Sequence, residues 1–236
     1  MSSFDSIPID TPLSRLPNFD PRTVPVIGID SHLPAAGREA LDPAALRQRF
    51  QVAPKWEPEV WAERRFTDRQ DARASVLVPI VMRDRPTVLL TERTTHLSTH
   101  SGQVAFPGGK QDESDTDEAH TALREAHEEI GLMPDRVEVI GRMPTYTTGT
   151  RFIITPVIGL VSADHEIKLN AFEVADAFEV PLDFLMNPAH HRRHALEWGG
   201  HRREWFSIPY MDGTNERFIW GATAAMLRNF YRFVIA

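Results

Sequence analysis

The feature that most constrains this fold is a pair of apolar runs near residue 80. Residues 74–82 (ASVLVPIVM) are almost continuously apolar and too short for most helices, which predicts a buried strand. The sequence RDRP at 83–86 predicts a turn, and residues 87–93 (TVLLTER) predict a second strand. The chain is therefore expected to build a sheet that begins near residue 74.

Two substantial helices accompany these strands. Between Thr116 and Ile130 the apolar residues fall on one helical stripe, and Gly131 and Pro134 follow where a helix would end. Strands mixed with helices predict a mixed α/β or α+β domain from about residue 70 to 236. The other predicted elements are strands at 137–143, 152–161, 203–210 and 216–220, a short helix at 180–186 and a last helix at 221–233.

The first 70 residues have a different character. Asp42 and Pro43 predict an N-cap and the first position of a short helix, and residues 58–65 (PEVWAERR) predict a second one. We therefore divide the chain into residues 1–70, an N-terminal arm with short helices, and residues 71–236, the main domain. The prolines that predict an extended arm or loop over residues 1–35 are Pro8, Pro12, Pro17, Pro21, Pro25 and Pro34.

Composition excludes several functions. The chain has no cysteine, so disulfides, thiolate metal sites and cysteine nucleophiles are ruled out. Its net charge of −7 weighs against nucleic acid as the main partner. The first ten residues lack the features of a secretory signal, and no apolar run approaches the roughly 20 residues that span a bilayer. We therefore expect a cytoplasmic protein with no membrane or nucleic-acid partner.

Three carboxylates on the central helix point to chemistry. Glu125, Glu128 and Glu129 are spaced i, i+3 and i+4, so they share one helix face. Such crowded like charges destabilise an isolated helix and suit a divalent cation such as Mg²⁺ or Mn²⁺. Arg124 lies one turn before Glu128 and could hold a carboxylate by an ion pair. A solvated acidic helix face is the alternative, and this segment alone favours that alternative.

The surrounding residues give the carboxylates a context. Gly109 follows another glycine, Arg124 directly precedes the first glutamate, and the helix exits at Gly131 and Leu132. Together they resemble the Nudix hydrolase box, G-x5-E-x7-R-E-U-x-E-E-x-G-U, where U is apolar. The first half departs from this pattern, because Asp115 replaces the first glutamate and eight residues separate it from Arg124.

The flanking sequence resembles one branch of that family, the coenzyme A diphosphatases. Residues 89–109 (LLTERTTHLSTHSGQVAFPGG) resemble the upstream signature of the branch, which also has a lengthened box with an aspartate. Ser98 stands where the branch usually has a basic residue, which leaves the exact substrate open. Further similarity lies at 155–161, 173–182 and 219–223.

The resemblance implies an α+β fold, an α/β/α sandwich with a mixed sheet between helices. It also implies a metal-dependent hydrolase whose small-molecule substrate is coenzyme A or a derivative, cleaved to 3′,5′-ADP and 4′-phosphopantetheine. Two alternatives stay open: another nucleoside diphosphate derivative, such as ADP-ribose or a dinucleotide, and a catalytically silent Nudix-like binding domain. The family resemblance further suggests a homodimer.

The resemblance also assigns roles to residues. Glu125, Glu128, Glu129 and the Gly109 carbonyl would hold Mg²⁺ or Mn²⁺, Arg124 would orient the carboxylates, and Asp115 would steady the loop. Two catalytic bases remain candidates, Glu125 itself and Glu173.

The segment after residue 189 is locally basic and histidine-rich. His190, His191 and His194 are interpreted as part of a solvated basic loop in preference to a zinc site. Its arginines could bind the 3′-phosphate of coenzyme A or simply balance surface charge. Trp198, Trp205 and Trp220 could stack on adenine, although core packing is the usual fate of tryptophan. The four arginines are Arg192, Arg193, Arg202 and Arg203.

Overall fold

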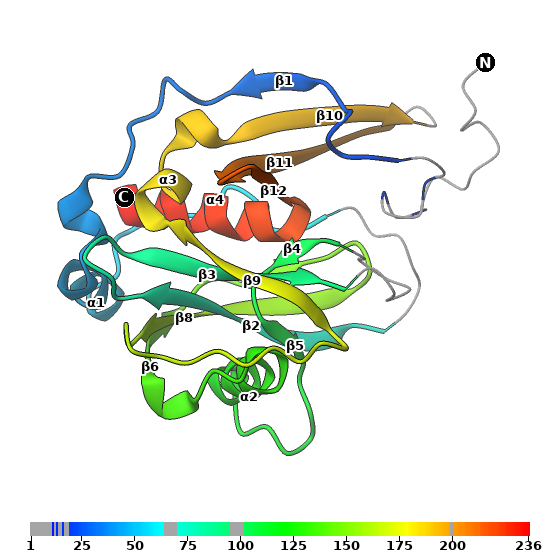
Figure 1. Ribbon diagram of the computed structural model, residues 1–236. Helices are drawn as coiled ribbons and strands as arrows, with labels where there is room; N and C mark the ends of the chain where they lie inside the picture. Colours follow the sequence, from blue (N-terminus) through cyan, green and yellow to red (C-terminus); the bar gives the residue numbers. More distant parts are fainter. Residues whose placement is uncertain are drawn as a thin grey trace.

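The computed structural model describes residues 11, 13, 16, 19–63, 70–94, 102–198 and 201–236, and Figure 1 shows how its elements are arranged. Its α-helices are α1 (Pro43–Gln51), α2 (Glu118–Ile130), α3 (Leu182–Leu185) and α4 (Gly221–Ile235), and 3-10 helices cover Arg38–Leu41, Pro134–Arg136 and Pro188–His190. The strands are β1 (Val26–Ile29), β2 (Ala72–Val81), β3 (Thr87–Arg93), β4 (Val104–Ala105), β5 (Gly108–Lys110), β6 (Val137–Arg142), β7 (Tyr146–Thr147), β8 (Phe152–Val161), β9 (Val174–Pro181), β10 (Arg192–Trp198), β11 (His201–Asp212) and β12 (Asn215–Trp220).

The larger of two sheets has eight strands within the described residues. Its path runs β4-β3-β2-β8-β6, with β5 beside β2, β7 beside β8 and β9 beside β3. β2 and β8 are parallel along their whole length, whereas the other pairs are antiparallel, so the sheet is mixed. The predicted strands correspond to β2, β3, β6 and β8 within one or two residues. β9 was not predicted as a strand.

β2 is almost continuously apolar because both faces of the sheet are covered. Leu77 and Val81 belong to the apolar cluster beneath α2, whereas Val78 and Ile80 belong to the larger cluster on the opposite face. All four side chains are buried. Alternate residues of a strand point to opposite faces, so a strand covered on both sides needs apolar side chains at every position.

Helix α2 begins and ends where its capping residues predict. The Asp117 carboxylate accepts a hydrogen bond from the His120 amide at 2.8 Å, and Gly131 ends the helix with a left-handed φ of 67°. Ala122, Ala126 and Ile130 are buried against the sheet. The three predicted metal ligands lie beside this apolar stripe, with Glu129 buried and Glu128 exposed.

A second sheet, in the order β1-β10-β11-β12, faces the larger one. Figure 1 shows α4 between the two sheets and α2 on the far side of the larger sheet. One apolar cluster joins them, with Leu90 from β3, Ile208 from β11 and Phe230 from α4. The mixed sheet therefore lies between α4 and α2, as the predicted α/β/α sandwich requires, and the second sheet adds a further layer.

The N-terminal region differs from its prediction in two places. Residues 26–29 form β1 at the edge of the second sheet, where proline-flanked backbone is tolerated. The helix predicted at 58–65 is wrong for its described part, because the Asn229 side chain binds the amides of Glu59 and Val60 at 2.9 and 3.0 Å. Residues 64–65 lie outside the described residues, as do Pro8, Pro12 and Pro17. The boundary at residue 70 stays a prediction.

The histidine-rich segment is not a solvated loop. Residues 192–198 form β10, paired with β11, and His191 and His194 are buried. The ring nitrogens of His194 lie 3.0 Å from the Val24 carbonyl and 2.8 Å from the Ser207 hydroxyl. Both nitrogens therefore have hydrogen-bond partners within the fold. The loop interpretation failed because these side chains have partners that are distant in sequence.

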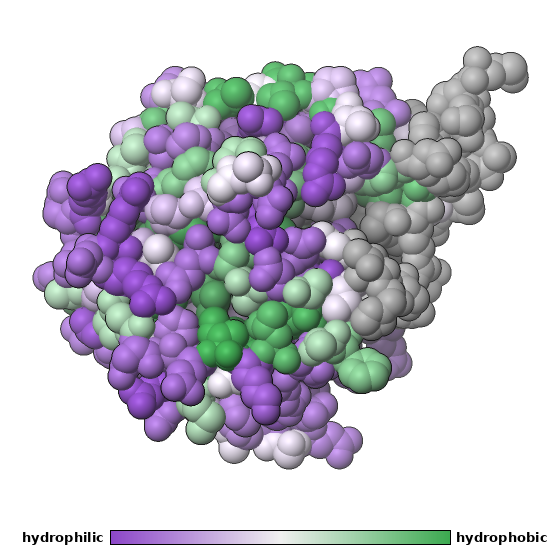
Figure 2. All heavy atoms as spheres, in the orientation of Figure 1, coloured by the Kyte–Doolittle hydropathy of each residue, from purple (hydrophilic) through white to green (hydrophobic). Residues whose placement is uncertain are grey.

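The molecular face in Figure 2 is mostly hydrophilic, with apolar atoms in interrupted patches. Exposed large apolar side chains include Val52, Trp61 and Phe172. Among the described residues, no helix is both long enough and apolar enough to cross a bilayer.

Candidate active site

Strand β5 brings the glycine pair against the carboxylate face of α2. Gly108 and Gly109 pair with Val76 and Ser75 of β2, and the short strand also contacts α2. A Cβ atom on Gly109 would lie 2.5 Å from the Glu125 carboxylate, closer than atoms approach without a bond. The absence of a side chain at Gly109 is therefore what lets the carboxylate reach this backbone.

Glu129 is the most deeply buried of the three helix carboxylates. Its Oε2 accepts a hydrogen bond from the Gly108 amide at 3.2 Å, and its Oε1 lies 3.6 Å from Nη1 of Arg93. Burial is the main reason that the pKa of Glu129 rises to about 7, with further contributions from the charges of Glu125 and Glu173. A cation beside Glu129 would relieve this unfavourable charge.

Arg124 organises the rest of the acidic groups. Its Nε and Nη2 bind the two oxygens of Asp115 at 3.0 and 2.9 Å, as a bidentate pair. Its Nη1 lies 3.0 Å from both Glu125 and Glu128, and its Nη2 donates to the Lys110 carbonyl at 3.1 Å. Hydrogen bonding to Arg124 holds the pKa of the buried Asp115 carboxyl far below its usual range.

Glu173 lies near the helix carboxylates because its loop is anchored to the end of α2. The Asn170 amide donates to the Glu129 carbonyl at 2.8 Å, and the Asn170 side chain donates to Glu173 Oε1 at 3.3 Å. The charge of Glu173 helps to raise the pKa of Glu125, after burial, which is the largest cause. The structure thus brings Glu125, Glu129 and Glu173 into one electrostatic neighbourhood.

Glu128 lies apart from this group. Its side chain is 54% exposed and contacts Arg124. Among the described residues, no three His, Asp or Glu side chains converge closely enough to hold a metal ion as they stand. The predicted ligands are thus gathered around one helix face but are not closed into a cage.

The chemistry of these groups nevertheless fits a divalent cation. The pKa values of Glu125 and Glu129 are both raised, so each carboxylate would be stabilised by a positive charge. Arg124 contacts Oε1 of Glu125 and Oε2 of Glu128, which leaves the second oxygen of each carboxylate outside these two bonds. Carboxylate and carbonyl oxygens are the donors that Mg²⁺ and Mn²⁺ prefer.

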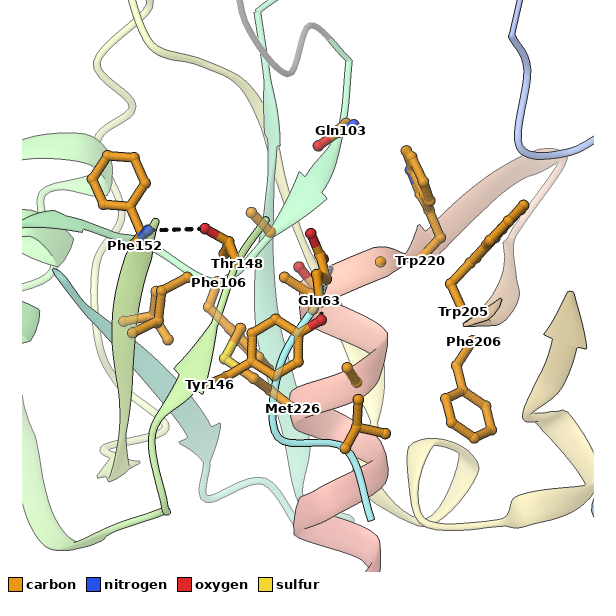
Figure 3. Close-up of a pocket in the computed structure, with 18 of the residues that line it drawn as sticks. Glu63, Gln103, Phe106, Tyr146, Thr148, Phe152, Trp205, Phe206, Trp220 and Met226 are labelled. Atoms are coloured by element: carbon orange, nitrogen blue, oxygen red, sulfur yellow. Dashed lines mark hydrogen bonds between the residues drawn. The ribbon is translucent and has the colours of Figure 1, made fainter. Parts of the chain in front are cut away.

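A large cavity leads away from these acids. It has a volume of about 690 Å³ and runs from Gly109 and Glu129 into the space between the two sheets. Figure 3 shows Tyr146 and Phe152 on one side, and Trp205 and Trp220 on the side of the second sheet. Its size and mixed lining are typical of small-molecule sites.

Three cavity residues had no role assigned from the sequence. Arg93 contacts Glu129, and it could have been noticed because it ends a predicted strand next to a polar stretch. Glu63 accepts hydrogen bonds from the Tyr146 hydroxyl at 3.0 Å and the Gly149 amide at 3.1 Å. Burial raises the pKa of Tyr146. Glu63 and Tyr146 are 83 positions apart, so no local pattern could connect them.

Comparison with known proteins places this site in a family. The sequence of residues 71–207, more than half of the chain, matches the NUDIX domain family. The chain therefore belongs to the Nudix family. It is 38% identical over 181 residues to "Uncharacterized Nudix hydrolase NudL" of Yersinia pestis (strain Pestoides F), covering 77% of this chain and 89% of that protein. NudL of Yersinia pseudotuberculosis serotype O:1b (strain IP 31758) gives the same values.

Solved Nudix structures match about half of the chain. A C. elegans Ap4A hydrolase binary complex is 18% identical, with a TM-score of 0.41 over 50% of this chain and 85% of that one. The NUDIX domain of Shewanella oneidensis NrtR complexed with ADP ribose is 24% identical, with a TM-score of 0.39 over 50% of this chain and 78% of that one.

The family match and the mixed sheet between helices confirm the predicted fold, and the family match confirms the predicted class of enzyme. The chain is a Nudix hydrolase, which acts on small molecules that contain a pyrophosphate. Nudix hydrolases generally use divalent metal ions. The identity of the metal, the substrate and the individual site residues stay predictions.

Proposed function

We propose that this hydrolase cleaves the diphosphate of coenzyme A or a derivative, giving 3′,5′-ADP and 4′-phosphopantetheine. The observation that carries the proposal is the position of residues 89–109, which resemble the coenzyme A diphosphatase signature. Several described residues of this segment line the cavity next to Glu129, including Arg93, Phe106 and Gly109. Ser98 and the rest of residues 95–101 lie outside the described residues.

Glu125, Glu128, Glu129 and the Gly109 carbonyl are the proposed ligands of Mg²⁺ or Mn²⁺. A bound divalent ion would neutralise phosphate oxygens and acidify water. Arg124 holds Glu125 and Glu128 at 3.0 Å and is itself fixed by Asp115, so it orients the two carboxylates. This support explains why the arginine precedes the first glutamate.

A carboxylate base must take the proton of the attacking water. Glu125 and Glu173 are both candidates, and their proximity leaves the choice open. Glu173→Gln separates them: if Glu173 is the base, turnover falls steeply, whereas little change in turnover assigns the role to Glu125. A base that acts near neutral pH must be largely ionised there.

Phosphorus NMR of a coenzyme A digest with Mg²⁺ tests the substrate. The diphosphate signals should be replaced by phosphomonoester signals of 3′,5′-ADP and 4′-phosphopantetheine. Glu129→Gln should lower turnover by orders of magnitude, whereas Glu138→Gln, an exposed residue paired with Arg47, should not. Intact coenzyme A alongside cleaved ADP-ribose or dinucleotide would reject this substrate and support the alternative. No cleavage of any of them would support a silent domain.

The cytoplasmic location and the homodimer also stay predictions. Light scattering of the purified protein tests the homodimer. A molecular mass close to 26.8 kDa, that of one chain, would reject the homodimer.

A further inference from the structure

The far wall of the cavity carries an aromatic group from the second sheet. Trp205 of β11 and Trp220, the last residue of β12, have ring centroids 6.4 Å apart at 68°. Phe19 packs on both, at 5.9 and 6.0 Å. Figure 3 shows the two tryptophans across the cavity from Tyr146, near the first turn of α4. Trp220 and α4 lie beyond residue 207, outside the part of the chain that the family match covers.

Two local rules are broken at this wall. Trp220 occupies the N-cap of α4, where short polar residues are preferred, and no side-chain hydrogen bond caps the helix among the described residues. The indole Nε1 of Trp205 is buried without a hydrogen-bond partner in the described part of the chain. Departures from local preference concentrate at functional sites, and a buried unpaired donor is costly. Core packing alone would not require either feature.

We propose that this wall binds the nucleobase of the substrate, with the base stacked on Trp220. A purine presents a flat π face to one tryptophan and ring-nitrogen acceptors along its edge. Trp205 already stacks on His194, with ring centroids 5.6 Å apart at 8°, whereas Trp220 is partly exposed and lines the cavity, so Trp220 is the ring offered to the base. The inference rests on the proposed function for the identity of the substrate, and it holds equally for ADP-ribose or another adenine-bearing diphosphate.

The same wall suits the nucleotide half of coenzyme A better than the pantetheine arm. The pantetheine arm is flexible and uncharged, whereas the nucleotide carries a phosphate beside its ribose. Arg202 and Arg203 line this end of the cavity, together with the first residues of α4, whose amides carry partial positive charge. Glu204 pairs with Arg202 at 2.5 Å and offsets part of that charge. The aromatic rings are therefore expected to provide most of the contact with the base, and the basic groups favour the phosphorylated nucleotide half of coenzyme A.

Calorimetric titration with 3′,5′-ADP in the presence of EDTA tests the subsite without requiring turnover. Trp220→Ala should weaken binding roughly 5- to 150-fold, the range expected for loss of one base–aromatic stack, and Trp220→Phe should retain most of the affinity. Trp61→Ala is the matched control, because Trp61 is 56% exposed and does not line the cavity. In steady-state assays Trp220→Ala should raise KM more than it lowers kcat.

Thermal melts of each variant establish that the fold persists before the affinities are compared. Equal affinity of Trp220→Ala and wild type would overturn the inference, and so would tight binding of 4′-phosphopantetheine that depends on Trp220. If coenzyme A is not hydrolysed but 3′,5′-ADP binding still depends on Trp220, the substrate assignment fails while the nucleobase subsite stands.

Discussion

Replacing Glu129 by glutamine removes a charge from a place where the fold holds it unfavourably. The Glu129 side chain is buried beneath Gly108, and burial raises its pKa from the usual 4.5 to about 7. Glutamine has nearly the same shape and can still accept the Gly108 hydrogen bond. We therefore expect Glu129→Gln to stabilise the metal-free protein at neutral pH while it lowers turnover.

The size of this effect follows from the pKa. The native state binds the proton more tightly than the unfolded state, so stability falls as the pH rises from about 4.5 to about 7. A tenfold change in an equilibrium is worth about 1.4 kcal/mol, which limits the loss to roughly 3 kcal/mol. The variant also loses the ion pair with Arg93 at 3.6 Å, which offsets part of the gain.

Urea unfolding in EDTA at pH 5 and pH 8 measures the difference. The unfolding free energy of Glu129→Gln relative to wild type should rise by about 1–3 kcal/mol between these pH values. Glu138→Gln removes an exposed carboxylate whose pKa is lowered by Arg47, so it should show no such rise. A pH-independent difference, or a variant less stable than wild type at pH 8, would refute the reasoning.

Three further substitutions test the support of the site and of the core. Gly109→Ala places a Cβ 2.5 Å from the Glu125 carboxylate, so kcat should fall while circular dichroism stays native; unchanged kcat would contradict this. Arg124→Lys loses the two parallel hydrogen bonds to Asp115, so the free energy of unfolding measured in urea should fall by about 2 kcal/mol. An unchanged free energy of unfolding would show that this bidentate pair is unimportant for stability. Arg228→Met removes a buried guanidinium from Asp30 and Glu59, which keep Arg193 as a partner, and should cost about 2 kcal/mol or more, whereas Arg47→Met, at an exposed pair, should cost under about 1 kcal/mol; equal losses would argue against the burial argument.

Local patterns predicted the elements whose cause is local. The ends of α2 follow from Asp117 and Gly131, and β2 follows from an apolar run that both faces of the sheet bury. The contact between Arg124 and Glu128 follows from their spacing of four on a helix. These features need no knowledge of the rest of the chain.

The missed features depend on partners far away in sequence. β9 carries Asp176 and Glu179 among its apolar residues, and its pairing with β3 makes it a strand. The helix expected at 58–65 is replaced because Asn229 takes its backbone amides. The burial of His194 depends on Val24 and Ser207, which no spacing rule connects to it.

The site shows the same division. Spacing on α2 placed Glu125 and Glu129 together, but it could not show that Glu128 lies out in solvent or that Glu129 is buried. The raised pKa of Glu129 comes from that burial, which a one-dimensional pattern does not contain. Asp115 was expected only to steady its loop, and its bidentate pair with Arg124, which forms across the turn before α2, was not predicted.

The link between Asn229 and residues 59–60 has a practical consequence for engineering. This asparagine ties residues 59–60, which precede the large sheet, to the final helix, and both segments line the compartment beside the acids. A fragment trimmed to residues 71–207 would leave that compartment without two of its sides. Any transplant of the pocket onto a related scaffold therefore has to carry both segments together.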